Sequence, residues 1–449
     1  MRREEYQHYF KDKKVIVMGL GLLGRGIADA RFLAACGAEV LVTDLKDEKV
    51  LKTSVDQLRK FSNITFILGE HRPEDFRNCD FVLKAAGVPL ESPFLEEARK
   101  NRIPIEMDES LFAKIAQGVT LVGITGTRGK STTTHLIFEM LKKKYEKKVF
   151  LAGNIRGKAT LPLLSEVSPG DIIVLELSSW QLQGFHDAAV SPNVGVFTNF
   201  LDDHLNYYHG DRDLYFKDKA AIFRFQKKGD TCVVGAQVAP LLAEESLQGN
   251  LIVARKEDVP SSWKRVLPGE HNQENIACAI HVARTLEVSD KDIQEVVETF
   301  KGVEGRLQLV RESNGVAFYN DTTATTPDAT FAGLKALGGK KPLVLIMGGT
   351  DKGLSFDQVL RAFPQYAQGV VLLPGTGTER IITHIQKLSF EKGVHQEDTL
   401  TGALNKAQTL LHGEKQGIIL FSPGFASFGM FQNEFDRSDQ FLALVETLN

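Results

Sequence analysis

The chain has 449 residues, too many for one ordinary hydrophobic core, so we expect about three domains. Hydrophobic residues make up 43% and charged residues 25% of the sequence, which is typical of a globular protein and argues against disorder. The net charge of −3 provides no overall field that would attract nucleic acid or an anionic membrane, so neither is expected as a partner.

The cysteines and the hydropathy pattern indicate the compartment. The four cysteines are far apart and form no C-x-x-C pair, which favours reduced thiols and argues against a zinc site. The N-terminal residues include acids and no apolar stretch, and no run elsewhere is long and apolar enough to cross a bilayer. We therefore expect a cytoplasmic protein, and we expect it to be a monomer.

The first predicted elements are a strand, a helix and a strand. A buried strand in residues 14–18 leads into a G-x-G-x-x-G loop that ends at Gly24, a helix follows over 25–36, and a second strand over 40–44 ends in Asp44. An acid about twenty residues after such glycines is the dinucleotide-binding pattern. The pattern says little about which nucleotide binds, so an NAD-dependent dehydrogenase with Asp44 on a ribose stays open as an alternative.

Further strands over 64–68 and 80–86 continue this α/β pattern. Three prolines then punctuate a helix and a short strand, and they indicate that the first domain ends near Glu106. We therefore assign residues 1–106 to an N-terminal Rossmann-like domain.

Residues 122–135 form the stretch around which the chain is organised. An apolar run leads into Gly126-Thr-Arg-Gly129 and then into a helical segment, the arrangement of a phosphate-binding loop. Lys130 would place its charge on terminal phosphates, and Ser131 or Thr132 would offer a hydroxyl to Mg²⁺. A turn without a ligand is the plainer alternative. Lys-Ser-Thr-Thr-Thr makes a poor helix start on propensity alone, which disfavours it.

Residues 171–182 open as an almost uninterrupted apolar run, and Glu176 lies inside it. Such a run predicts a strand covered on both faces, as in a parallel sheet. An acid inside it is costly unless paired or bound to a metal, and the strand after a phosphate loop is where nucleotide-hydrolysing sites hold Mg²⁺. The alternative is an ordinary acid at a strand end in solvent.

A strand starting at Asn193 ends in a polar cluster that contains His204, and a helix predicted over residues 215–224 carries Lys219 near its start. Strand ends are where α/β sites lie. On residue type alone, a single histidine or a helical lysine is more often an ordinary structural residue.

Asn272 and Asn275 share one face of a predicted helix start, where two carboxamides could read an adenine edge, although asparagine is also common at helix N-caps. A turn near Gly305 follows a further helix, and we place the second boundary there. The central domain is then 107–304, and residues 305–449 restart a Rossmann-like α/β pattern with strands over 315–320, 342–348, 369–373 and 417–421. The expected fold class is α/β with three domains.

These motifs taken together resemble the Mur ligase family. The resemblance spans nearly the whole chain and rests on residues 126–132, 175–182, 203–204 with Lys219, 271–275, 348–352 and 422–428. It implies an ATP-dependent amide ligase of peptidoglycan precursor synthesis. Gly-Leu-Gly-Leu-Leu-Gly in the first domain is similar to the branch that adds D-glutamate to UDP-N-acetylmuramoyl-L-alanine through an acyl phosphate, and it implies that this domain holds UDP rather than NAD.

The resemblance also implies roles for individual residues. Those implied to hold ATP are Gly126, Thr127, Gly129, Lys130, Ser131, Thr132, Asn154, Asn272, Asn275, Arg306 and Asp321. Those implied to bind Mg²⁺, with two ions expected, are Ser131, Glu176, His204 and Lys219, the lysine being carbamylated by CO₂. Those implied to catalyse the reaction are Lys130, Glu176, His204 and Lys219. Those implied to line the UDP and D-glutamate sites are Leu22, Leu23, Asp44 and Leu45, and Thr325, Lys352, Ser427 and Phe435.

Two positions depart from the family pattern. Gly305 stands where the family often has histidine before the arginine, and Thr323 stands where it often has lysine. Other Mur ligases and folylpolyglutamate synthetase share the phosphate loop and the Asp-His pair, and they stay open as alternatives.

Overall fold

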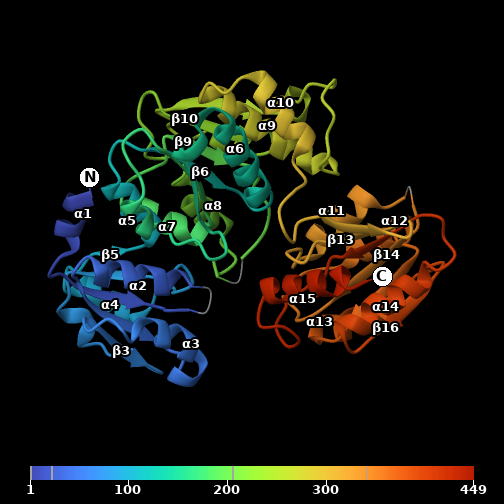
Figure 1. Cartoon of the computed structure of the whole chain (residues 1–449), viewed down its shortest axis with the longest axis horizontal. Coiled ribbons are helices and arrows are strands. Elements are labelled where there is room, and N and C mark those ends of the chain that lie inside the picture. The colour runs from blue at the N-terminus through green and yellow to red at the C-terminus, as the bar shows by residue number, and fades with distance from the viewer. Residues whose placement is uncertain (1–2, 22–23, 205–206, 340, 449) are drawn as a thin grey trace. The chain divides into compact units, whose positions relative to one another are not determined.

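The computed structural model describes residues 3–21, 24–204, 207–339 and 341–448. The chain divides into two compact units, Met1–Val259 with Glu274–Gln294, and Pro260–Gln273 with Glu295–Asn449. Three α/β sheets, two in the first unit and one in the second, confirm the predicted fold class (Figure 1). The domain limits at residues 106 and 304 stay predictions. No helix in the described parts of the chain has the length and apolar character needed to cross a membrane.

The first sheet is parallel, in the order β3-β2-β1-β4-β5. Its strands are β1 Lys14–Met18, β2 Glu39–Asp44, β3 Ile64–Leu68, β4 Phe81–Lys84 and β5 Ile105–Glu106. The helices of this part are α1 Arg3–Phe10, α2 Arg25–Ala35, α3 Glu48–Leu58, η1 Asp75–Arg77 and α4 Pro93–Lys100. The predicted strand-helix-strand unit is therefore confirmed as β1, α2 and β2. Gly24 begins α2 in the left-handed region, with φ of 86°.

The second sheet is also parallel, in the order β11-β10-β9-β6-β8-β7. Its strands are β6 Thr120–Thr125, β7 Val149–Gly153, β8 Ile172–Glu176, β9 Val194–Phe197, β10 Thr231–Gly235 and β11 Asn250–Ala254. The α-helices in this stretch of sequence are α5 Asp108–Ile115, α6 Lys130–Tyr145, α7 Ser179–Asp187, α8 Arg212–Ala220, α9 Glu270–Thr285 and α10 Asp290–Thr299. The short 3-10 helices are η2 Glu146–Lys148, η3 Leu161–Ser165, η4 Ala239–Leu242 and η5 Lys256–Asp258.

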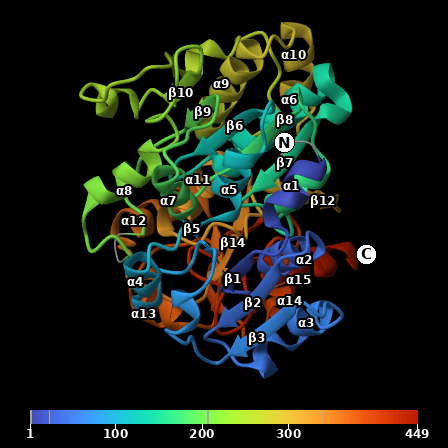
Figure 2. The ribbon, with the colours of Figure 1, turned by 90° about the vertical axis from the view of Figure 1, so that its left-hand side faces the viewer.

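One hydrophobic cluster joins the first two sheets. It contains Val17 of β1 and Leu33 of α2 together with Phe112 of α5 and Ile173 of β8. Figure 2 labels the four elements that carry these residues. All five residues of β8 are buried, as predicted for a strand with both faces covered. Helix α2 thus packs together with elements of the part of the chain that carries the phosphate loop.

The third sheet has the order β12-β13-β17-β14-β15-β16, with only the β12–β13 pair antiparallel. Its strands are β12 Gln308–Ser313, β13 Val316–Asn320, β14 Leu343–Gly348, β15 Gly369–Leu373, β16 Gly393–Gln396 and β17 Gly417–Phe421. Its helices are α11 Pro327–Leu337, α12 Asp357–Tyr366, α13 Thr376–Ile385, α14 Leu400–Leu410 and α15 Glu434–Glu446.

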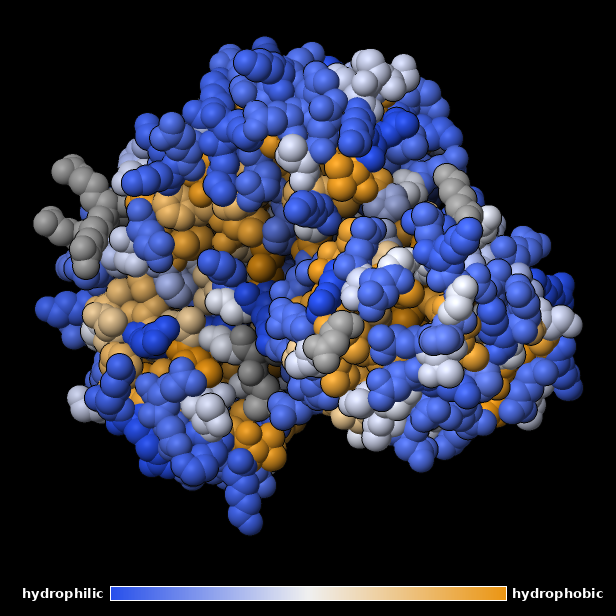
Figure 3. Space-filling view, turned by 45° about the vertical axis from the view of Figure 1, so that its right-hand side comes forward, coloured by the Kyte–Doolittle hydropathy of each residue, from blue (hydrophilic) through white to orange (hydrophobic). Residues whose placement is uncertain are grey.

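Alternation along β14 explains the two helix layers of this sheet. Leu343 and Leu345 join a cluster with residues of α11, α12 and α13, whereas Val344 and Ile346 join a second cluster with residues of α14 and α15. Successive side chains on a strand point to opposite faces, so a continuous apolar run requires cover on both. Polar and charged side chains dominate the outer surface in Figure 3.

The helix that carries Lys219 differs from the prediction. It was expected over residues 215–224 with Lys219 near its start, but α8 runs from Arg212 to Ala220 and holds Lys219 in its last turn. The Asp211 side chain accepts hydrogen bonds from the Asp213 and Leu214 amides and so begins the helix earlier.

A capping box begins α7 directly after the strand that ends in Glu176. The Ser178 hydroxyl accepts from the Gln181 amide, and the Gln181 side chain accepts from the Ser178 amide. Ser178→Ala should lower the free energy of unfolding by about 1 kcal/mol, measured by urea titration. Ser246→Ala, in an exposed loop, is the control. Equal stability of both variants and the parent would show that the box contributes nothing.

Candidate active site

The phosphate loop joins β6 to α6 and requires glycine at two positions. Gly126 has φ of 148° and Gly129, the N-cap of α6, has φ of 83°. A Cβ on Gly126 would overlap Thr198, and a Cβ on Gly129 would overlap Asn275. Only glycine fits this close approach, and Gly129 begins α6, whose N-terminus offers the partial positive charge that an anion site requires.

Lys130 lies over this loop. Its Nζ donates to the carbonyls of Gly126 at 3.0 Å and of Thr127 at 3.1 Å. Asn199, just after β9, holds the same loop, because its Oδ1 accepts from the Arg128 amide at 2.8 Å. The lysine is therefore placed where a bound polyphosphate would meet its charge.

Glu176 is buried, with 2% of its surface exposed, and receives two hydrogen bonds. Ser131 Oγ donates to Glu176 Oε2 at 2.5 Å, and Asn154 Nδ2 donates to Oε1 at 3.2 Å. The interpretation of Glu176 as a strand-end acid in solvent is therefore wrong. A hydroxyl and a carboxylate oxygen in contact beside a phosphate loop are a ligand pair of the kind Mg²⁺ takes, so these residues fit that ion.

Lys219 is also buried, with 2% of its surface exposed. Its Nζ donates to the Gly126 carbonyl at 3.0 Å and lies 4.8 Å from the centroid of the Tyr215 ring. Burial, and then the positive charge of Lys130, hold the pKa of Lys219 well below its usual range. The buried amine therefore lies against the loop, which excludes the interpretation of Lys219 as a solvated surface charge.

Asp203 and His204 follow β9, and Asp203 contacts Arg128 of the phosphate loop. Burial would raise the pKa of Asp203, but Arg128 at 2.9 Å and the neighbouring His204 lower it to about 2. The His204 ring centroid is 4.8 Å from that of Trp180, and its Nε2 is 3.8 Å from Asp203 Oδ2. Within the described residues, no three His, Cys, Asp or Glu side chains are grouped to hold a metal ion.

Four further residues predicted to hold nucleotide lie on α6, on α9 and in the loop before α6. Thr127 and Thr132 are buried in the loop and the first turn of α6. Asn275 is buried against Gly129, and Asn272 donates from Nδ2 to the Pro268 carbonyl at 2.7 Å. Asn275 therefore contacts the phosphate loop itself, whereas the contact of Asn272 lies within its own helix start.

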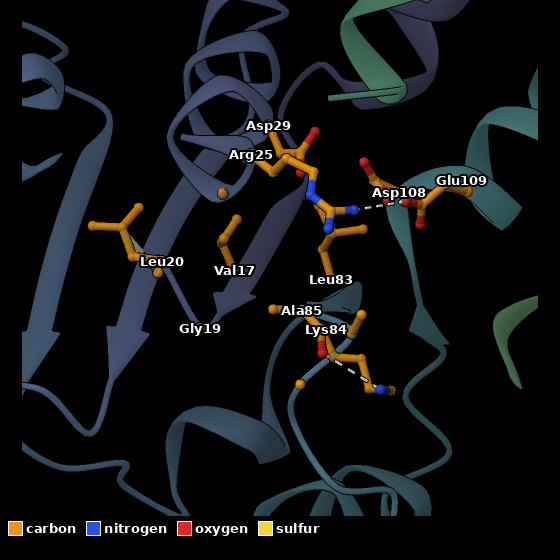
Figure 4. A pocket seen from close by; sticks show the side chains of 14 residues that line it. Val17, Gly19, Leu20, Arg25, Asp29, Leu83, Lys84, Ala85, Asp108 and Glu109 are labelled. Atoms are coloured by element: carbon orange, nitrogen blue, oxygen red, sulfur yellow. Dashed lines mark hydrogen bonds and ion pairs between the residues drawn. The ribbon is translucent and has the colours of Figure 1, made fainter. Parts of the chain in front are cut away.

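A pocket of about 200 Å³ lies at the carboxyl ends of β1 and β4 (Figure 4). Gly19, Gly21 and Gly26 line it, and so do Arg25 of α2 and Glu109 of α5. Such strand ends are where open α/β sheets bind ligands.

The four residues predicted to hold uridine follow this glycine loop and β2. Asp44 is buried, and its Oδ2 accepts from the Gly21 amide at 3.2 Å, so this carboxylate braces the loop. Leu45 is 66% exposed, and an exposed leucine beside a glycine loop suits the face of a planar ligand. Leu22 and Leu23 lie outside the described residues.

In the second unit, Asp321 follows β13 and is buried. Its Oδ2 accepts from Ser422 Oγ at 2.7 Å, and its Oδ1 accepts from the Leu307 amide at 3.1 Å. Burial raises the pKa of Asp321 to about 7, against the lowering effect of these hydrogen bonds and of Arg306. Asp321 therefore ties the ends of β13 and β17 to the turn that carries Arg306.

Two of the residues predicted to hold D-glutamate are in contact. Lys352 Nζ donates to Thr325 Oγ1 at 2.9 Å. Ser427 is buried, in the segment 422–428 that is joined to 348–352 by paired hydrogen bonds between Thr350 and Ala426. Phe435 is the second residue of α15, and its amide donates to Asn433 Oδ1 at 2.9 Å.

The two departures from the family pattern lie against each other. Thr323 donates from its amide at 3.1 Å and from Oγ1 at 2.8 Å to the Gly305 carbonyl. Gly305 has φ of 72°, and a Cβ there would come within 3.1 Å of Thr322 and Thr323. A small residue at each position therefore permits the same turn.

Replacing Asp321 by Asn should remove a pH dependence of stability. The folded protein keeps a proton that the unfolded chain releases near pH ~4, so stability falls as pH rises between ~4 and ~7. Urea titrations at pH 5 and pH 8 should show that this fall, of roughly 2–4 kcal/mol for one group, is lost in Asp321→Asn. Asp328→Asn, at an exposed position of α11, should keep it. An unchanged slope in Asp321→Asn would refute the assignment.

Sequence reasoning missed the residues that hold the site residues in place. Asn199 and Arg128 fix the phosphate loop, and Arg25 contacts Glu109 and Asn154. The one available signal for Arg25 was its position directly after the third glycine of the first loop.

Three family models match the chain. They are the Mur ligase MurD-like N-terminal domain over residues 13–106, the Mur ligase middle domain over 124–253, and the Mur ligase glutamate ligase domain over 305–424. The first match places the glycine loop in a Mur ligase domain, which argues against the dehydrogenase alternative.

Curated relatives match over nearly their whole length. The UDP-N-acetylmuramoylalanine--D-glutamate ligase of Roseiflexus sp. (strain RS-1) is 36% identical, covering 97% of this chain and 98% of its own. Enzymes of the same name from Borreliella afzelii (strain PKo) and Clostridioides difficile (strain 630) are 35% and 31% identical and cover 98% of this chain.

Solved structures share the fold. A Thermotoga maritima UDP-N-acetylmuramate-alanine ligase has a TM-score of 0.63 at 19% identity, covering 97% of this chain and 99% of its own. The MurF ligase of the same organism, in complex with ADP, has a TM-score of 0.59 at 20% identity, covering 98% and 96%. The sheets and the glycine-dependent loop define an α/β protein with a phosphate-binding loop. The chain belongs to the Mur ligase family.

Proposed function

We propose that this protein is the ATP-dependent ligase that joins D-glutamate to UDP-N-acetylmuramoyl-L-alanine in peptidoglycan precursor synthesis. The observation that carries the proposal is the set of Lys130, Ser131, Glu176 and Lys219 gathered at one phosphate loop. Relatives that bear this activity in their names match the chain from end to end. A cytoplasmic location and a monomeric state stay predictions.

Phosphoryl transfer to a carboxylate needs charge compensation and alignment more than covalent chemistry from the protein. Lys130 and the loop amides hold the ATP phosphates, and the helix N-terminus at Gly129 adds its dipole. The γ-phosphoryl group passes to the alanine carboxylate of the acceptor, and ADP leaves. The amine of D-glutamate then attacks the acyl phosphate, and inorganic phosphate leaves as the amide forms.

Mg²⁺, when bound, neutralises phosphate charge and polarises the transferring group. Ser131 and Glu176 would hold it together with His204. Lys219 in its neutral form is nucleophilic, so its amine can add to CO₂ and release a proton, which converts a buried amine into an anionic oxygen ligand. This accounts for a buried lysine whose Nζ donates to a hydroxyl and a carbonyl oxygen, Thr125 Oγ1 and the Gly126 carbonyl.

In the remaining assignments, the glycine-loop pocket with Asp44 and Leu45 receives the UDP end of the acceptor. The nucleoside of ATP is held by the residues Asn154, Asn272, Asn275, Arg306 and Asp321. The amino acid is held by Thr325, Lys352, Ser427 and Phe435. The contact between Lys352 and Thr325 supports this last group, because a lysine paired with a hydroxyl can exchange that partner for a carboxylate.

An assay of phosphate release with each substrate omitted in turn tests the proposal. Release should require ATP, UDP-N-acetylmuramoyl-L-alanine and D-glutamate together, and mass spectrometry should find the amide product. Activity with L-alanine or L-lysine and none with D-glutamate would instead assign the protein to another Mur ligase. Phosphate release without an amino acid would indicate an ATPase.

A further inference from the structure

Arg25 lies where the glycine-loop pocket meets the domain that carries the phosphate loop. It is the first residue of α2, and its guanidinium reaches toward α5 (Figure 4). Nη1 donates to Glu109 Oε1 at 3.2 Å, and Nη2 donates to Asn154 Oδ1 at 3.0 Å. About a quarter of the side chain is exposed, so Arg25 belongs both to the pocket wall and to the domain contact.

Asn154 connects Arg25 to Glu176 through two hydrogen bonds. Its oxygen accepts from Arg25, while its Nδ2 donates to Glu176 Oε1. Arg25 therefore holds the Asn154 amide from the side opposite the carboxylate. Without the guanidinium, the amide oxygen loses this donor, so Asn154 and its hydrogen bond to Glu176 are held less firmly.

Glu109 holds Arg25 from the other side. This buried carboxylate also accepts from Gln181, the residue that closes the capping box of α7. Because α7 follows β8 directly, the hydrogen bonds through Asn154 and those through Glu109 both lead to the segment that contains Glu176 and Ser178. The Arg25 guanidinium is therefore held in place, because rotating it would break its hydrogen bonds to Glu109 and Asn154.

We propose that Arg25 is a positioning residue that couples occupancy of the glycine-loop pocket to the orientation of the Glu176 carboxylate through Asn154. Arg25 and Lys84 are the cations in the lining of this pocket, beside Asp29, Asp108 and Glu109, and the exposed part of Arg25 can receive an anionic group of the acceptor. Its charge holds the guanidinium in place and so keeps Asn154 turned with Nδ2 toward Glu176. The contact of Asn154 with Glu176 forms without the acceptor, and an acceptor anion on Arg25 would hold it more firmly. This inference rests on the proposed function for the identity of the acceptor and of the ion.

Mn²⁺ binding tests the inference without turnover. Mn²⁺ would be titrated by electron paramagnetic resonance in the presence of ADP, with and without UDP-N-acetylmuramoyl-L-alanine. In the parent protein the acceptor should tighten Mn²⁺ binding. In Arg25→Met the affinity should fall roughly tenfold, as for other groups that orient a metal ligand, and the acceptor should no longer change it.

Arg31→Met is the matched control, because Arg31 is an exposed arginine of the same helix. Arg25→Lys keeps a charge beside Glu109 but lacks the planar guanidinium that places separate nitrogens on Glu109 and Asn154, so it should also lose the acceptor effect. If Arg25→Met does not fold, the test is made with Arg25→Lys. Equal Mn²⁺ affinity and an equal acceptor effect in the Arg25 and Arg31 variants would overturn the inference.

A double-mutant cycle separates positioning from a general structural role. If Arg25 acts through Asn154, Arg25→Met should weaken Mn²⁺ binding little further in an Asn154→Ala background. Additive losses would contradict the inference. Ligation of D-glutamate by the parent protein is measured separately, so the proposed function can hold while this inference fails.

Discussion

Replacing Lys130 by Met is expected to lower kcat for ligation by about 10³-fold or more, with little change in the folded state. The Lys130 Nζ lies 3.0 Å from the Gly126 carbonyl, at the point of the loop where the terminal phosphates of ATP would bind. Its charge offsets the charge that moves with the phosphoryl group, and such groups contribute most in the transition state. Steady-state kinetics of ADP release measures the effect.

Lys142→Met is the control for this prediction. Lys142 is an exposed lysine of the same helix α6, so its loss should leave kcat unchanged while removing the same charge from the protein. Comparable activity of Lys130→Met and Lys142→Met would mean that Lys130 does not act on the phosphates. A rise in KM for ATP with unchanged kcat would mean that it serves ground-state binding alone.

Replacing Lys219 by Met is expected to lower kcat roughly 10²–10³-fold. Burial and the charge of Lys130 lower the pKa of this amine, which favours the uncharged form that can add to CO₂. The variant keeps the apolar stem but cannot form the anionic ligand. In the parent protein, ¹³C-labelled bicarbonate should give a carbamate carbon signal that is absent from the variant.

Lys217→Met, at an exposed position of the same helix α8, should keep both the signal and the activity. Full activity of the parent protein in buffer free of CO₂, with no carbamate signal, would show that catalysis does not need a carbamylated Lys219. Lys219 would then act as a hydrogen-bond donor to the Gly126 carbonyl.

The sequence predicted the elements whose signals are local. The apolar run of β8, the glycines of the phosphate loop and the start of α6 follow from strand burial and backbone freedom, and all were found. Glu176 could be singled out because an acid at the end of a buried strand is costly. The half-exposed strand β16 gave no such signal, because partly solvated edge strands lack a continuous apolar run.

Contacts between distant residues could not be predicted in this way. Arg25 and Asn154 are 129 positions apart, and nothing in either local pattern indicates that they share a hydrogen bond. The pairing of Thr323 with Gly305 likewise depends on the turn that brings them together. The residues that orient the site were therefore missed, while those implied to touch the ligands were named.

The central claim is that the chain activates a carboxylate by phosphoryl transfer before the amide forms, and an oxygen-isotope experiment tests it directly. UDP-N-acetylmuramoyl-L-alanine labelled with ¹⁸O in its alanine carboxylate would be incubated with ATP and D-glutamate, and the released phosphate analysed by mass spectrometry. The account predicts one ¹⁸O atom in each phosphate, because the oxygen that attacks the γ-phosphoryl group leaves with it. Phosphate free of ¹⁸O alongside normal amide formation would contradict it.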